Sequence, residues 1–508
     1  MTATVWDAEM ADGALILVLD EGTTSTRAIV FDRDFAPVAT AQAEVPLHYP
    51  SDGWVEQDPA LIWEQTLAVA REAVAAAGGA GAIAGIGITN QRETTIVWNR
   101  QTGAPIAPAI VWQDRRTAEA CAAMEADGHG DAIRRETGLL LDPYFSATKI
   151  AWILDHVPGA RAAADAGDLA FGTVDTWLLW KLTGGALHAT DVTNASRTLL
   201  YPLAVDAGTD WSAAMVERFS VPRSMLGRVM PSSAQFGMTD PALFGRPIPI
   251  LSAIGDQQAA LVGQGCMGPG MAKITYGTGA FLVANTGDRR PASENRLLGT
   301  VGYGLEGQGG AYALEGAIFN AGTVVQWLRD DLGLIADAAE SEARAAALSG
   351  SGGVYLVPAF TGLGAPHWDP GARGTISGLT RASTADHIIR AGLEAAAYQT
   401  RDLLEAFAAD GADVGELRVD GGMAANDWLM QFVADICDRP VLRPDYGEMT
   451  ALGAAALAAM ALGWTTPDAW AARAVPGRRF TPAMAPDARG EMLAGWDRAL
   501  RRTLTAAS

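Results

Sequence analysis

One stretch near the N-terminus constrains the fold more than any other. Residues 15–19 (Leu-Ile-Leu-Val-Leu) are apolar without alternation, which indicates a strand that is covered on both faces. Residues 20–26 (Asp-Glu-Gly-Thr-Thr-Ser-Thr) are turn-forming, and residues 27–32 have the pattern of a second strand. The stretch therefore predicts a β-hairpin whose turn carries acidic side chains, a glycine and several hydroxyl groups.

The composition of this turn suits a phosphate group. Backbone N–H groups and hydroxyls match phosphate oxygens, and a carboxylate such as Asp20 suits a magnesium ion bound to those oxygens. The alternative is a turn whose Asp and Thr side chains only satisfy nearby backbone groups. Three later stretches, residues 249–258, 271–281 and 417–426, also join an apolar strand to a polar or glycine-rich turn. Four such junctions favour a nucleotide held between two domains.

Length and charge exclude several classes of protein. A chain of 508 residues is too long for one ordinary core, so two large domains are expected. A net charge of −21 argues against binding to nucleic acid or to an anionic membrane. No apolar run reaches the length of a membrane span, and the N-terminus lacks the pattern of a signal peptide, so we expect a soluble cytoplasmic protein. The three cysteines lack metal-binding spacing and are expected to be buried and unpaired.

Strand and helix patterns alternate along the chain, which predicts an α/β fold. We expect Asp58 to cap the first long helix and Asp175 to cap a helix over residues 176–182, without a chemical role. Gly322 is expected in the interior of a helix, where glycine costs about 1 kcal/mol relative to alanine. The helices expected elsewhere cover residues 59–77, 315–332, 384–411, 426–436 and 450–463.

Charged residues at strand ends are the first candidates for a site. Arg92 and Glu93 follow the strand expected at residues 85–89 and precede another apolar run. They either contribute to a site or form an ion pair that closes the loop. Asp256 follows the strand expected from residue 249, where it either performs chemistry or caps the helix that begins at Gln257.

Taken together, the motifs resemble those of the FGGY carbohydrate kinases, in the same order. They are Asp20-Glu-Gly-Thr-Thr, Ile88-Thr-Asn-Gln-Arg-Glu-Thr-Thr, Gly255-Asp-Gln-Gln-Ala-Ala-Leu, Tyr276-Gly-Thr-Gly and Val419-Asp-Gly-Gly. Residues 109–118, 141–146 and 357–366 are similar, more narrowly, to the members that phosphorylate glycerol. The resemblance covers roughly residues 15–465. It implies two actin-like, ribonuclease H-like domains, at residues 15–253 and 254–508, with the active site in the cleft between them.

The resemblance also implies a role for individual residues. The positions that match polyol-binding residues are Arg92, Glu93, Trp112, Tyr144, Asp256, Gln257 and Phe281. Asp256 is the expected general base, because a carboxylate can accept the proton of an attacking alcohol. The positions that match ATP-binding residues are Thr23, Thr24, Ser25, Arg27, Thr278, Gly322, Gln326, Gly422 and Asn426. Asp20 is expected to orient Mg²⁺, mostly through water.

The expected activity is ATP-dependent phosphorylation of glycerol to sn-glycerol 3-phosphate by a homo-oligomer, a dimer or tetramer. One alternative is a kinase for another small polyol or ketose, such as erythritol or xylulose. The other is a non-phosphorylating ATP-binding protein of the actin/Hsp70 type. The family usually has Gln where this chain has Glu21. That carboxylate either repels the phosphates, alters magnesium binding or points away from the site.

Overall fold

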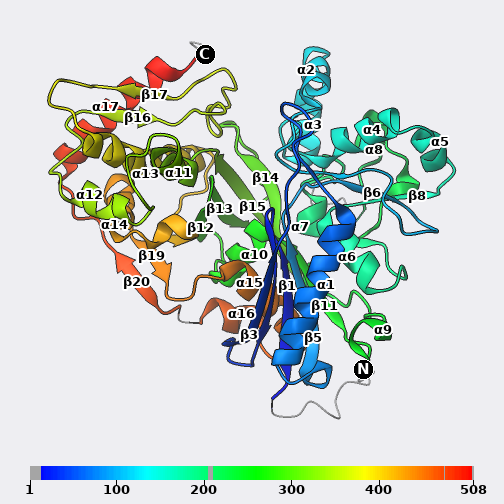
Figure 1. The fold of residues 1–508 in the computed structure, drawn as a ribbon. Helices are drawn as coiled ribbons and strands as arrows, with labels where there is room; N and C mark the ends of the chain where they lie inside the picture. Colours follow the sequence, from blue (N-terminus) through cyan, green and yellow to red (C-terminus); the bar gives the residue numbers. More distant parts are fainter. Residues whose placement is uncertain (1–12, 204–209, 474, 506–508) are drawn as a thin grey trace.

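The computed structural model describes residues 13–203, 210–473 and 475–505, arranged as two lobes around a central layer (Figure 1). The first sheet has the order β11-β5-β1-β2-β3. Its strands are β1 (Leu15–Glu21), β2 (Ser25–Phe31), β3 (Pro37–Glu44), β5 (Ile83–Asn90) and β11 (Ile250–Gly255). β1 and β2 pair antiparallel with Asp20 opposite Arg27, which confirms the predicted hairpin.

The second sheet has the order β14-β15-β13-β12-β18-β19-β20. Its strands are β12 (Ala272–Tyr276), β13 (Ala280–Gly287), β14 (Leu298–Leu305), β15 (Gly309–Ile318), β18 (Leu417–Asp420), β19 (Val441–Pro444) and β20 (Gly477–Phe480). Three antiparallel strands followed by two parallel ones occur in both sheets, as β3-β2-β1-β5-β11 and as β15-β13-β12-β18-β19. This repeated core confirms the two-domain, actin-like α/β fold.

Two helices join the lobes. α15 (Met449–Ala461) packs on β1, β5 and β11, and α10 (Asp256–Gly263) contacts both α15 and the second sheet. Their backbones approach so closely that an added Cβ at Gly453 would lie 1.8 Å from the Ala259 carbonyl oxygen. The Ala-rich helix expected at residues 450–463 is therefore confirmed as a close-packing element. β11 runs past residue 253, and the division of the chain at that residue stays a prediction.

The other long helices cover the outer faces of the sheets. Asp58 caps α1 (Pro59–Ala76), as predicted, and this helix packs on β2 and β3. Thr384 caps α13 (Ala385–Ala409), and Asn426 caps α14 (Asp427–Cys437). The outer part of the first lobe contains β6 (Ile96–Asn99), β8 (Leu169–Gly172), α2 (Ala118–Ala126), α3 (Gly130–Thr137), α4 (Ser146–His156), α5 (Ala160–Asp165) and α8 (Ala213–Arg218). The helix α17 (Pro486–Thr503) closes the second lobe.

Two sequence-based predictions are wrong. Residues 315–332 are not one helix: Glu315 lies in β15, and α11 (Gly322–Asp330) begins at Gly322. A short apolar run does not distinguish a buried strand from a helix, and pairing with β13 and β14 decides for the strand. Asp175 does not cap α6 (Val174–Leu182), because Thr173 occupies the N-cap. Its carboxylate accepts hydrogen bonds from the hydroxyls of Thr173 and Thr190 instead.

Cys121, Cys266 and Cys437 are buried and free, as expected. No helix in the described part of the chain combines the length and the apolar character needed to cross a membrane.

Candidate active site

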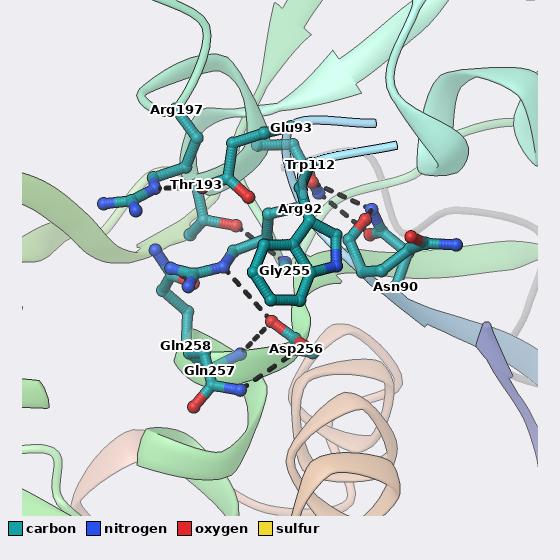
Figure 2. A network of polar contacts seen from close by, with 12 residues as sticks. Asn90, Arg92, Glu93, Trp112, Thr193, Arg197, Gly255, Asp256, Gln257 and Gln258 are labelled. Carbon is teal, nitrogen blue, oxygen red and sulfur yellow. Dashed lines mark hydrogen bonds and ion pairs between the residues drawn. The ribbon is translucent and has the colours of Figure 1, made fainter. Parts of the chain in front are cut away.

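Three parallel strands bring the charged residues of the first lobe to one edge. β1, β5 and β11 run in the same direction, so their carboxyl ends meet at one edge, where Asp20 lies near the end of β1 and Arg92 and Asp256 follow β5 and β11. Ligands of α/β sheets bind at such carboxyl ends. Figure 2 shows Arg92, Glu93, Trp112, Asp256 and Gln257 together at this position.

Asp256 is the most open of the charged groups here. Arg92 Nε lies 3.2 Å from Asp256 Oδ1, and the arginine side chain is 2% exposed whereas the aspartate side chain is 31% exposed. The backbone N–H of Gln257 donates to Asp256 Oδ1 at 2.7 Å. Asp256 therefore begins α10 as a helix-terminal residue, yet a face of its carboxylate remains accessible to a ligand.

An aromatic wall borders these polar groups. The ring of Trp112 meets those of Tyr144 and Phe281 edge to face, with centroids 5.6 and 6.3 Å apart. Phe281 lies on β13 of the second lobe, so the wall joins the two lobes. The seven predicted polyol residues thus combine hydrogen-bonding groups with an apolar surface, which suits an uncharged molecule that has several hydroxyls.

The backbone of Glu93 is in the left-handed region, with φ of 60°. Such strain in a residue other than glycine persists only where the surroundings hold it. The hydroxyl of Ser146 donates to the Glu93 carbonyl oxygen at 3.0 Å, and Arg197 Nε donates to the Glu93 carboxylate at 2.6 Å. Both contacts fix the direction in which the Glu93 side chain leaves the chain.

Sequence reasoning missed three buried charged residues behind this site: Arg197, Lys273 and Glu315. Glu315 was hidden by the incorrect helix assignment. Lys273 Nζ donates to Gln257 Oε1 at 2.5 Å and to the Thr275 hydroxyl at 2.9 Å, and burial lowers its pKa to about 8. A charged residue within an apolar strand pattern is the one signal that could have identified Lys273 and Glu315.

The hairpin turn lies beside this group of residues. The Gly22 N–H donates to the Ser25 carbonyl oxygen at 2.9 Å, and the indole N–H of Trp112 donates to the Thr23 hydroxyl at 2.9 Å. Thr24 is exposed. The Arg27 guanidinium contacts the Glu448 carboxylate from the second lobe, and both side chains of this ion pair are partly exposed.

The Glu21 side chain points away from the turn. It is fully buried, and the hydroxyl of Thr66 on α1 donates to its Oε2 at 2.8 Å. Burial raises the pKa of Glu21 to about 8. The geometry therefore favours a carboxylate that points away from the site over one that repels the phosphates or alters magnesium binding.

Asp20 is the carboxylate next to the turn. Burial raises its pKa to about 7, although Arg27 acts in the opposite direction. Within the described ranges, no cluster of three or more His, Cys, Asp and Glu side chains is arranged around a common metal position. A single carboxylate fits Mg²⁺, which keeps several waters and takes further oxygens from substrate phosphates.

A cavity of about 440 Å³ in the second lobe brings the remaining predicted nucleotide residues together. Its lining includes Thr278, Gly322, Gln326, Gly422 and Asn426. The carbonyl oxygen of Gly277 accepts from the Gly322 N–H at 3.0 Å, and an added Cβ at Gly322 would lie 2.5 Å from that oxygen. This close approach explains the glycine and leaves backbone to form one wall of the cavity.

Comparison with known proteins agrees with this arrangement. The N-terminal and C-terminal domain models of the FGGY family of carbohydrate kinases match residues 15–263 and 272–462. The glycerol kinase of Rhodospirillum centenum is 57% identical over 98% of this chain and all of its own length. Glycerol kinase 1 of Pseudomonas aeruginosa is 55% identical over 96% of this chain and 98% of its own.

A solved structure extends the similarity to three dimensions. Plasmodium falciparum glycerol kinase with ADP superposes with a TM-score of 0.91 at 34% identity, over 98% of this chain and 100% of that one. Sequence, domain order and fold therefore agree along nearly the whole chain. The chain belongs to the FGGY family of carbohydrate kinases.

Proposed function

We propose that this protein transfers the γ-phosphoryl group of ATP to a terminal hydroxyl of glycerol and forms sn-glycerol 3-phosphate. One observation carries the proposal: the polar groups of Arg92, Glu93, Asp256 and Gln257 lie together at the carboxyl edge of the first sheet, beside the aromatic wall. Glycerol has three hydroxyls on a short apolar chain, so it matches both parts. The high identity to glycerol kinases supports the same substrate.

Each side chain then has a defined task. Asp256 accepts the proton of the attacking hydroxyl, as a carboxylate with an open face can. Arg92 and Glu93 orient the other hydroxyls, and Trp112 with Phe281 covers the carbon chain. A site built to hydrogen-bond hydroxyls discriminates against molecules that leave its polar groups unpaired.

The turn at Thr23, Thr24 and Ser25 faces the β- and γ-phosphates in this proposal, and Thr278 faces them from the second lobe. Arg27 gives up its ion pair with Glu448 and then binds the transferred phosphoryl group. Asp20 would hold Mg²⁺, and the ion would supply positive charge to neutralise that of the phosphates. The cavity lined by Gly322, Gln326, Gly422 and Asn426 takes the adenosine.

The proposal includes a cytoplasmic location, which the three free cysteines support, because thiols stay reduced there. A homo-oligomeric state is proposed from the family resemblance alone.

The test is a coupled ADP-release assay with MgATP and a panel of glycerol, erythritol, dihydroxyacetone, xylulose and ribulose. We expect kcat/KM for glycerol to exceed that for every other compound at least tenfold. If the enzyme prefers another compound of the panel, the proposed kinase reaction stands, but that compound and not glycerol is the substrate. ATP hydrolysis that no polyol alters would instead favour the non-phosphorylating ATP-binding protein.

A further inference from the structure

Glu315 is an unusual residue for the middle of a sheet. It lies on β15, opposite Val283 of β13 and Leu298 of β14, and it is 0% exposed. Burying a carboxylate costs several kcal/mol unless other groups compensate for its charge. Its position therefore demands partners, and these come from the other lobe.

Both oxygens of Glu315 bind arginines. Oε2 accepts from Arg92 Nη1 at 2.5 Å, and Oε1 accepts from Arg92 Nη2 at 3.1 Å and from Arg197 Nη2 at 2.9 Å. Burial alone would raise the pKa of Glu315, but the two guanidinium groups outweigh it and lower the pKa to about 2. One ionised carboxylate of the second lobe thus holds two arginines of the first.

Each arginine then holds a carboxylate of the polyol site. Arg92 Nε lies 3.2 Å from Asp256 Oδ1, and Arg197 Nε lies 2.6 Å from Glu93 Oε1. Arg197 also packs against the ring of Tyr144, with its Cζ 5.7 Å from the centroid. Figure 2 shows Arg92 directed toward Asp256 and Arg197 directed toward Glu93.

The segment that carries Arg197 is itself anchored to the second sheet. The hydroxyls of Ser196 and Thr300 lie 2.9 Å apart, and the Val301 N–H donates to Ser196 Oγ at 3.2 Å. These contacts with β14, together with the bond to Glu315 on β15, fix the position of the Arg197 guanidinium relative to the second sheet.

We infer that Glu315 and Arg197 are positioning residues for the polyol: they hold Arg92, Glu93 and Tyr144 in place without touching the substrate. The inference rests on the proposed function, because it assigns the support of the same site. The buried side chains Arg92, Arg197, Glu93 and Glu315 carry two positive and two negative charges. Loss of the Glu315 charge would leave the partly exposed Asp256 as the ion-pair partner of Arg92 and Glu93 as that of Arg197, and would remove the carboxylate that holds both arginines together.

The test replaces Glu315 by the isosteric amide and separates substrate affinity from folding. In Glu315→Gln we expect the KM for glycerol to rise about tenfold, which is about 1.4 kcal/mol, with the KM for ATP within about twofold. Glu315→Asp keeps the charge and should restore part of the glycerol affinity. The matched control is Glu394→Gln, a buried glutamate paired with Arg390 at 2.7 Å on α13. It should lower the melting temperature without raising the KM for glycerol.

Several outcomes would overturn the positioning role. One is a folded Glu315→Gln enzyme with an unchanged KM for glycerol, and another is an equal rise in both KM values. If Glu315→Gln does not fold, Arg197→Lys gives the same readout, because lysine keeps the charge but cannot bind Glu93 and Glu315 together. Wild-type enzyme in the same assay tests the proposed function separately. If it prefers another polyol, that compound replaces glycerol in the comparison, and turnover of no polyol would overturn both proposals.

Discussion

The proposed polyol site and the proposed nucleotide site, called here the polyol half and the nucleotide half, are built by different means. The polyol half consists of side chains: Arg92 and Glu93 are buried, charged and supported by further charges behind them. The cavity of the nucleotide half is lined by three glycines, by apolar side chains such as Val325 and Leu393, and by fewer polar side chains, and Gly322 lies close against Gly277 in its wall.

The difference reflects what each half has to recognise. A small polyol offers only hydroxyls, so specificity requires donors and acceptors at fixed positions. A nucleotide offers a large surface, and a cavity whose shape admits it needs few dedicated groups. We therefore expect substitutions in the two halves to affect different kinetic constants.

The largest expected effect is that of Asp256→Asn, which tests whether the polyol half contains the chemistry as well as the binding. A general base contributes about 10²–10⁴ in rate, so kcat should fall about a thousandfold. The KM for ATP should stay within about twofold, because Asn preserves the shape of the helix start. Steady-state kinetics measures both, and near-wild-type turnover would remove Asp256 as the base.

Arg92→Ala should act on the polyol half alone. A hydrogen bond to a charged group is worth about 1.5–3 kcal/mol, so the KM for glycerol should rise about a hundredfold while the KM for ATP changes little. Arg390→Ala removes another buried arginine, paired with Glu394, and serves as the control for the effect of lost stability. An unchanged KM for glycerol in folded Arg92→Ala would show that Arg92 does not belong to the polyol half.

Gly322→Ala is the converse experiment in the nucleotide half. The new methyl group would lie 2.5 Å from the Gly277 carbonyl oxygen, so the cavity wall must move. We expect the KM for ATP to rise about tenfold, which is about 1.4 kcal/mol, with the KM for glycerol within about twofold. Gly490→Ala on α17 is the control, because nothing lies within 4 Å of its added Cβ. Equal changes in both constants would show that the halves are not separable.

Glu21→Gln should have the smallest effect on activity, because this side chain points to Thr66 and not to the phosphates. We expect kcat within about threefold of wild type. The two proteins should differ more clearly in how their stability depends on pH. Burial raises the pKa of Glu21 from 4.5 to about 8, so wild type loses stability as the pH rises through this interval. Melting temperatures at pH 5 and pH 8 should show a smaller decrease for Glu21→Gln; an identical decrease would contradict the assignment.

The order of motifs in the sequence was sufficient to predict the fold and the grouping of the candidate site. Strand-end positions located Asp20, Arg92 and Asp256, because parallel strands place their carboxyl ends at one edge of a sheet. The glycines of the nucleotide half were assigned from the family resemblance instead, because the sequence pattern placed Gly322 inside a helix, whereas it begins α11.

The sequence by itself therefore determined the α/β class, the hairpin and the strand-end positions of Asp20, Arg92 and Asp256, since local patterns and short motifs encode them. Only the tertiary structure decided that Glu315 is a strand residue, that it binds Arg92 from 223 residues away, and that Glu21 points inward. The reason is physical. Periodicity reports which residues are buried within an element, whereas compensation of a buried charge depends on which distant element packs against it.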